Sequence, residues 1–181
     1  MIDKITYENY TFTPFITEEQ IQVRIRELAK QISEDYKGKD PVFVGVLNGS
    51  FLFMADLVRQ FVGDCEVDFI KVSSYGKEMH SSGSVELLKD INVKAKDRHI
   101  IIVEDIVDTG LSYSFLKSQI DMRSPASTAV VTLLHKPEAL KYDVKIDYIG
   151  FVIPNKFVIG YGLDLAQRFR NLREIYALSE E

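Results

Sequence analysis

Residues 99–112 have the sequence HIIIVEDIVDTGLS, which joins an apolar run to a polar, glycine-containing loop. The uninterrupted apolar run is typical of a strand that is covered on both faces, as in a parallel sheet. Glu104 and Asp105 follow the run directly, so we expect both carboxylates at the C-terminal edge of that sheet. The loop DIVDTG comes next, and residues 111–122 are predicted to form a helix. A strand, a polar loop and a helix in this order indicate an α/β fold.

Further strands and helices alternate on both sides of this segment. Residues 17–37 have apolar side chains at helical spacing, and Thr17 and Gln20 have the spacing of a capping box. Residues 51–62 also look helical. Strands are predicted over 41–47, 65–72, 99–104, 127–134 and 146–153, with 173–179 pairing at a sheet edge. The alternation predicts a central, mostly parallel sheet flanked by helices, with ligands bound beyond the carboxyl ends of its strands. The polar segment 73–84 is predicted to be a long mobile loop of the kind that often binds ligands.

The composition is that of an ordinary globular protein. The chain has 181 residues, 46% of them apolar and 27% charged, which suits one domain and excludes a disordered or disulfide-scaffold protein. The net charge of −5 argues against a nucleic-acid surface. The single cysteine, Cys65, fits a reducing compartment and is predicted to be a small buried side chain. We find no signal peptide and no apolar segment as long as a membrane helix, so we expect a cytoplasmic protein without membrane or nucleic-acid partners.

The loop after the central strand has the composition of a phosphate site. Gly110 permits backbone N–H groups to turn toward a ligand, and the hydroxyls of Thr109 and Ser112 lie at the start of the predicted helix. Phosphate is the anion that such a cradle favours. The nearby carboxylates would repel phosphate unless they contact sugar hydroxyls or a divalent metal ion. The segment therefore indicates one ligand with ribose, phosphate and Mg²⁺, whereas an acidic turn that only caps a helix explains fewer of its residues.

Five segments carry a resemblance to known proteins. VEDIVDTGLS (103–112) resembles the phosphoribosyl diphosphate signature of the type I phosphoribosyltransferases. From about residue 40 to the end, the chain resembles the hypoxanthine-guanine phosphoribosyltransferases in LNGSFLF (47–53), SSYG (73–76), LLHKP (133–137) and FVIGYGLDLAQRFRNL (157–172). The resemblance implies a single domain, 1–181, with a Rossmann-like core over about 18–150 and a small hood from about 1–17 and 151–181.

The resemblance also implies an activity. A family member of this kind is a purine salvage enzyme, which transfers the 5-phosphoribosyl group from phosphoribosyl diphosphate to N9 of hypoxanthine, and also of guanine. The products are IMP or GMP and pyrophosphate, the cofactor is Mg²⁺, and the assembly is a homodimer or homotetramer.

The family's phosphoribosyl diphosphate contacts carry over to named residues. Glu104 and Asp105 match the acidic pair that holds the ribose hydroxyls and associated Mg²⁺. Asp164 matches a second Mg²⁺-associated carboxylate, and Arg170 matches a pyrophosphate contact. The loop that cradles the 5′-phosphate corresponds to Asp108, Thr109, Gly110, Leu111 and Ser112. Ser74 and Tyr75 match the mobile loop that closes over the reacting centre.

The base contacts carry over in the same way. Asp108 matches the proposed general base or acid that manages the proton on purine N7. Lys136 matches the lysine that reaches the 6-oxo group, and as a donor-only side chain it is mismatched against the 6-amino group of adenine. Phe157 matches the aromatic ring that stacks on the base, and Val158 matches the neighbour whose backbone meets the base edge.

The chain departs from the family at one position. The family often has Lys-Gly in the pyrophosphate loop, with an unusual cis peptide, whereas this chain has Asn48 and Gly49 and so lacks a positive charge near the leaving group. Two other functions compete with the enzyme. One is a regulator of the same fold that binds nucleic acid and senses the sugar diphosphate, and the other is a phospho-receiver domain, whose acidic pair should lie nearer the N-terminus.

Several of these residues also have plain structural explanations. Lys136 alone would be a solvated strand end, and Phe157 and Val158 would be ordinary core residues. Asp164 and Arg170 would form a surface ion pair of little energetic value.

Overall fold

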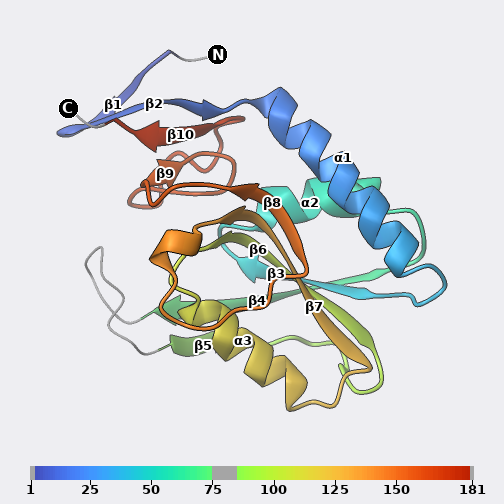
Figure 1. Ribbon diagram of the computed structural model, residues 1–181. Coiled ribbons are helices and arrows are strands. Elements are labelled where there is room, and N and C mark those ends of the chain that lie inside the picture. The colour runs from blue at the N-terminus through green and yellow to red at the C-terminus, as the bar shows by residue number, and fades with distance from the viewer. Residues whose placement is uncertain (1–2, 75–84, 180–181) are drawn as a thin grey trace.

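The computed structural model describes residues 3–74 and 85–179, which form two sheets and three α-helices (Figure 1). The larger sheet has the strand order β5-β4-β3-β6-β7-β8. Its strands are β3 (Val42–Leu47), β4 (Glu66–Ser74), β5 (Val85–Lys89), β6 (His99–Val107), β7 (Ser127–His135) and β8 (Tyr148–Val152). All neighbouring pairs are parallel except β4 and β5, which are antiparallel. This arrangement confirms the predicted α/β fold with a mostly parallel central sheet.

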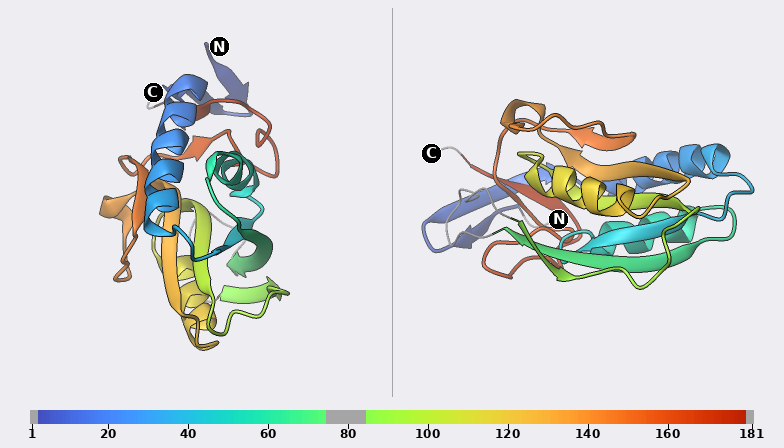
Figure 2. Two further views of the ribbon diagram at one scale, coloured as in Figure 1. Left: turned by 90° about the vertical axis from the view of Figure 1, so that its right-hand side faces the viewer. Right: turned by 90° about the horizontal axis from the view of Figure 1, so that it is seen from below.

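The helices cover both faces of this sheet (Figures 1 and 2). On one face α1 (Glu18–Asp35) and α2 (Phe51–Gln60) pack together, and α3 (Leu111–Asp121) lies on the other face. The capping box of Thr17 and Gln20 forms as predicted and starts α1. The helix buries the apolar stripe that its sequence spacing indicates, namely Ile21, Ile25, Leu28 and Ile32. A 3₁₀ turn, Pro137–Ala139, follows β7.

The smaller sheet joins the two ends of the chain (upper left in Figure 1). Its order is β1-β2-β10-β9, from β1 (Ile5–Tyr7), β2 (Tyr10–Ile16), β10 (Ile175–Leu178) and β9 (Val158–Ile159). The prediction that 173–179 pairs at an edge was wrong, because β10 lies between β2 and β9 and pairs with both. This interior position buries Tyr176 against Phe12 and Ile159. The predicted hood, about 1–17 and 151–181, contains all four strands of this sheet.

The structure differs from the predictions around β4. The buried side chains of this strand are Asp68 and Ile70, whereas Val67 is 46% exposed and Cys65 is only partly buried. Asp68 lies inside because its carboxylate accepts hydrogen bonds from the backbone N–H groups of Phe69, Asn92 and Val93. The strand predicted over 65–72 therefore forms, but Cys65 is only partly buried rather than buried as predicted.

The predicted loop 73–84 overlaps the end of β4 by its first two residues. β4 continues to Ser74, and β5, which was not predicted, begins at Val85 and pairs with β4. Most of that segment, with Tyr75, lies outside the described residues. Among the described residues, no helix has the length and apolar character needed to cross a membrane.

Candidate active site

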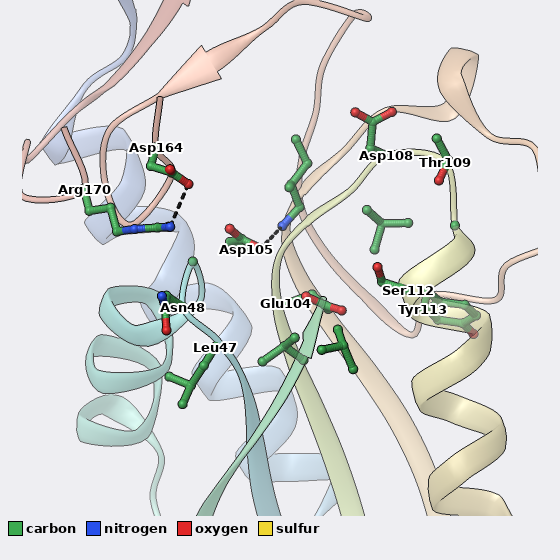
Figure 3. A pocket seen from close by; sticks show the side chains of 16 residues that line it. Leu47, Asn48, Glu104, Asp105, Asp108, Thr109, Ser112, Tyr113, Asp164 and Arg170 are labelled. Carbon is green, nitrogen blue, oxygen red and sulfur yellow. Dashed lines mark hydrogen bonds and ion pairs between the residues drawn. The ribbon is translucent and has the colours of Figure 1, made fainter. Parts of the chain in front are cut away.

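A cavity of about 320 Å³ opens at the carboxyl ends of β3 and β6 (Figure 3). In Figure 3, Glu104 and Asp105 lie between Asp164 and Arg170 on one side and Ser112 on the other. The lining residues are Val46, Leu47, Asn48, Gly49, Val72, Glu104, Asp105, Ile106, Val107, Asp108, Thr109, Gly110, Ser112, Tyr113, Asp164 and Arg170. The acidic pair, the glycine-containing loop and the hood residues predicted from the sequence therefore meet at one cavity.

The acidic pair lies inside β6 rather than after it, because this strand continues to Val107. Burial, followed by the neighbouring charge of Asp105, raises the pKa of Glu104 well above its usual range. Burial likewise raises the pKa of Asp105 to about 6, although the backbone N–H of Ile106 and the charge of Arg170 act in the opposite direction. A nearby cation would favour the ionised form of both carboxylates and so offset this desolvation.

The floor of the cavity is tightly packed at Gly49. A Cβ atom at this position would lie 1.6 Å from Oδ2 of Asp105, so only glycine lets the two segments approach each other. The peptide bond between Leu47 and Asn48 is cis. Both Asn48 and Gly49 line the cavity, as predicted for the pyrophosphate loop.

The glycine-containing loop forms the start of α3. Gly110 is the N-cap residue, with a φ of +85°, and no side chain caps the helix. Its N-terminal N–H groups are therefore available to an anion. The backbone N–H groups of Lys141 and Tyr142 donate to the carbonyl of Thr109 at 2.9 and 3.3 Å and hold the loop from outside. Leu111 is not among the residues that line the cavity. Its N–H donates to Oγ1 of Thr109 at 3.4 Å.

Asp164 and Arg170 are more than a surface ion pair. Their side chains lie 2.7 Å apart and both line the cavity. The second carboxylate oxygen of Asp164 accepts the N–H of Gln167 at 2.8 Å, and Arg170 donates to the carbonyl of Gly162 at 2.7 Å. The hood loop is thus folded around this pair.

A second cavity of about 210 Å³ shares four of these lining residues. It is bounded by Asp105, Ile106, Asp108, Lys136, Phe157, Val158, Leu163 and Asp164. Lys136 is only 5% exposed and its Nζ lies 3.2 Å from Oδ2 of Asp108, so it is not a solvated strand end. Phe157 is partly exposed and Val158 is buried, and both face this cavity.

The sequence analysis missed some lining residues and named others that remain untested. Tyr113 lines the larger cavity, and its signal was faint because it is an ordinary apolar position of the helix that follows the loop. Ser74 is the last residue of β4, whereas Tyr75 lies outside the described residues. In the described part of the chain, no three His, Cys, Asp or Glu side chains gather closely enough to hold a metal ion by themselves. A metal at Glu104, Asp105 or Asp164 would therefore take its other ligands from substrate and water.

We expect Asp105→Asn to stabilise the ligand-free protein at neutral pH. Because burial raises the pKa of Asp105 to about 6, the folded state binds more protons than the unfolded state between about pH 4 and pH 6. The free energy of unfolding should therefore fall as the pH rises through that window. The asparagine side chain does not ionise, so the variant should not lose this stability. In excess chelator at pH 7.5 the variant should melt roughly 2–4 °C higher than the wild type, and this difference should shrink toward pH 4.

The control for this experiment is Asp143→Asn, at an exposed carboxylate. A melting temperature of Asp105→Asn that equals or lies below that of the control at pH 7.5 would contradict the assignment of a destabilising buried charge.

Comparisons with known proteins show the family of this chain. The model of the phosphoribosyl transferase domain matches residues 16–166. The chain is 44% identical over 163 residues to the hypoxanthine-guanine phosphoribosyltransferase of Bacillus subtilis, covering 90% of this chain and 91% of that protein. It is also 44% identical to the bifunctional protein TilS/HprT of Listeria monocytogenes, of whose length it spans only 26%.

A solved structure gives the same result. The hypoxanthine-guanine phosphoribosyltransferase of Bacillus anthracis superposes with a TM-score of 0.87 at 45% identity, covering 92% of this chain and 98% of that one. These similarities confirm the resemblance inferred from the five sequence segments and exclude a phospho-receiver domain. The chain belongs to the phosphoribosyltransferase family and, within it, to the hypoxanthine-guanine phosphoribosyltransferases.

Proposed function

We propose that this protein transfers the 5-phosphoribosyl group from phosphoribosyl diphosphate to N9 of hypoxanthine, and also of guanine. The observation that carries this proposal is the pair of cavities that share Asp105, Ile106, Asp108 and Asp164. The larger cavity has the anion-binding start of α3, and the smaller one has the buried Lys136 beside Asp108. A sugar phosphate in the first and a purine in the second would meet at the shared residues.

The larger cavity would hold phosphoribosyl diphosphate. The N–H groups and hydroxyls of residues 109–112 would bind the 5′-phosphate, and Glu104 and Asp105 would accept hydrogen bonds from the ribose hydroxyls. Arg170 and the Asn48–Gly49 loop would contact the diphosphate. Since Asn48 is neutral, Arg170 carries more of the charge interaction with the leaving group than it would beside a lysine.

Mg²⁺ fits the same cavity by the chemistry of its donors. The carboxylates of Glu104 and Asp105 are hard oxygen ligands, and a cation beside them would offset the desolvation that raises their pKa values. Asp164 presents a further carboxylate from the hood. When bound, Mg²⁺ would neutralise charge on the diphosphate and so assist its departure.

The smaller cavity would hold the base. As the bond from C1 of the ribose to the diphosphate breaks and the bond to N9 forms, the proton on N7 must leave, and Asp108, which lines this cavity, would accept it. Lys136 would donate to the 6-oxo group, and Phe157 would stack on the ring. In the ligand-free structure Lys136 and Asp108 contact each other, so an entering 6-oxopurine replaces one ion pair with two contacts to the base. Ser74, Tyr75 and the residues that follow them would exclude water from the reacting carbon.

The direct test is incubation of the purified protein with hypoxanthine, phosphoribosyl diphosphate and Mg²⁺. We expect IMP and pyrophosphate in equal amounts. Absence of nucleotide from folded protein, together with salt-dependent binding of nucleic acid, would instead support the regulator, although the net charge of −5 disfavours it. The cytoplasmic location and the homodimer or homotetramer remain predictions, to be checked by fractionation and by sedimentation.

We expect nucleotide formation to require a divalent cation. The cavity supplies carboxylates but, in the described residues, no cluster of three that holds a metal alone, so the cation should arrive with the diphosphate and be removable. Turnover should stop in excess chelator and return when Mg²⁺ is added back. Full activity after verified removal of metal would contradict the metal assignment of Glu104, Asp105 and Asp164.

A further inference from the structure

Tyr161 lies in an unusual turn between the small sheet and the active site. The turn begins directly after β9, and Gly160, Tyr161 and Gly162 all have positive φ values, of +96°, +48° and +98°. Positive φ is ordinary for glycine but uncommon for a bulky side chain such as tyrosine. A tyrosine therefore keeps this conformation only because its surroundings hold it there.

The side chain of Tyr161 is held by the helical layer. It is 4% exposed, and its hydroxyl donates to Oδ2 of Asp56 in α2 at 2.6 Å. The same carboxylate oxygen accepts Nε2 of Gln22 in α1 at 2.8 Å, and Arg59 lies 3.8 Å from the other oxygen. Tyr161 thus ties the hood turn to both helices on one face of the central sheet.

The backbone next to Tyr161 contacts the active site directly. A Cβ atom at Gly162 would lie 2.0 Å from the carbonyl oxygen of Gly49, so the hood turn rests directly on the pyrophosphate loop. Gly49 in turn rests against the carboxylate of Asp105. The carbonyl of Gly162 accepts Arg170 at 2.7 Å, and its N–H donates to the carbonyl of Arg170 at 2.9 Å. Moving Tyr161 would therefore move Arg170 relative to Asp105.

We propose that Tyr161, through its hydrogen bond to Asp56, is a positioning residue for the diphosphate side of the active site. The inference rests on the proposed function, because it assigns the Arg170 side of the larger cavity to the diphosphate. The base side has a different support: Val158 and Ile159 are held in β9 by pairing with β10. Removing the hydrogen bond between Tyr161 and Asp56 should consequently weaken binding of phosphoribosyl diphosphate more than binding of the base.

The test compares Tyr161→Phe with Tyr148→Phe. Tyr148 is also buried, at 7% exposed, and its hydroxyl donates to Asp35 in α1 at 2.8 Å, but it lines neither cavity. Both variants lose one tyrosine–carboxylate hydrogen bond and should lose similar thermal stability. Only Tyr161→Phe should raise KM and the calorimetric Kd for phosphoribosyl diphosphate, by about ten-fold, with KM for hypoxanthine nearly unchanged. It should also speed hydrogen exchange at the amides of residue 161 and Gly162, which donate to the carbonyls of Leu172 and Arg170.

A second variant keeps the test decisive if Tyr161→Phe does not fold. Asp56→Ala removes the acceptor and should reproduce the same split, and the double variant with Tyr161→Phe should be no worse than the more affected single one. Equal KM values for phosphoribosyl diphosphate in Tyr161→Phe and Tyr148→Phe would overturn the positioning role. If the wild type formed no nucleotide, the proposed function would fail. Hydrogen exchange would then still show whether Tyr161 orders the turn, and calorimetry would show whether it affects the affinity for phosphoribosyl diphosphate.

Discussion

Replacing Asp108 by Asn should slow the chemical step by about 10²–10⁴-fold while leaving the binding of phosphoribosyl diphosphate nearly unchanged. Asp108 lines both cavities, and its carboxylate lies 3.2 Å from the Lys136 ammonium group, at the place where a purine would present N7 beside its 6-oxo group. An amide keeps the size and the hydrogen bonding of the side chain but cannot take the N7 proton as a carboxylate does. Pre-steady-state turnover is the measurement, because slow product release can hide a chemical defect.

The competing explanation for Asp108 is structural, as a cap of the following helix. The N-cap residue of α3 is Gly110 and no side-chain hydrogen bond caps the helix, so we expect little loss of thermal stability in Asp108→Asn. A chemical step within a few-fold of the wild type would reduce Asp108 to a binding residue. A large loss of stability without a specific chemical defect would support the structural explanation.

Replacing Lys136 by Gln should weaken the selection of 6-oxopurines over adenine. The buried ammonium group is donor-only and favours a 6-oxo acceptor, whereas glutamine also offers an acceptor to a 6-amino group. A site built to pair a polar group of its substrate can reject the mismatched analogue by about 10⁴-fold, so losing the pairing should narrow the preference by a large factor. The ratio of kcat/KM for hypoxanthine to that for adenine is the quantity to measure.

The control for this experiment is Lys141→Gln. The side chain of Lys141 is exposed, and its bond to the carbonyl of Thr109 comes from the backbone, which the substitution preserves. The control should keep the wild-type base preference. An unchanged ratio in Lys136→Gln would show that another group reads position 6 of the base.

The central α/β layer was predictable because local patterns and burial agree there. The apolar run before Glu104 forms β6, and the stripe of residues 17–37 forms the buried face of α1. The burial of Asp68 in β4 was not predictable, because it depends on backbone donors from residues 92 and 93 that no local rule reveals. The same holds for β10, whose interior place depends on partners at the other end of the chain.

The candidate site was likewise predictable only where its residues are contiguous in the sequence. The glycine-containing loop and the acidic pair are contiguous in sequence, so their chemistry was visible before their geometry. The Tyr161–Asp56 contact joins residues 105 positions apart, and a tyrosine between two glycines gives no sign of its acceptor. The fit of Gly162 on Gly49 likewise exists only in the folded chain.

The most direct measurement is a base panel with phosphoribosyl diphosphate and Mg²⁺, in which nucleotide formation is followed for hypoxanthine, guanine, xanthine and adenine. The account predicts efficient turnover of hypoxanthine, turnover of guanine, and a kcat/KM for adenine lower by about 10²-fold or more, because the Lys136 donor would face position 6 of a base in the smaller cavity. A kcat/KM for adenine equal to that for hypoxanthine would contradict the assignment of this pocket to 6-oxopurines.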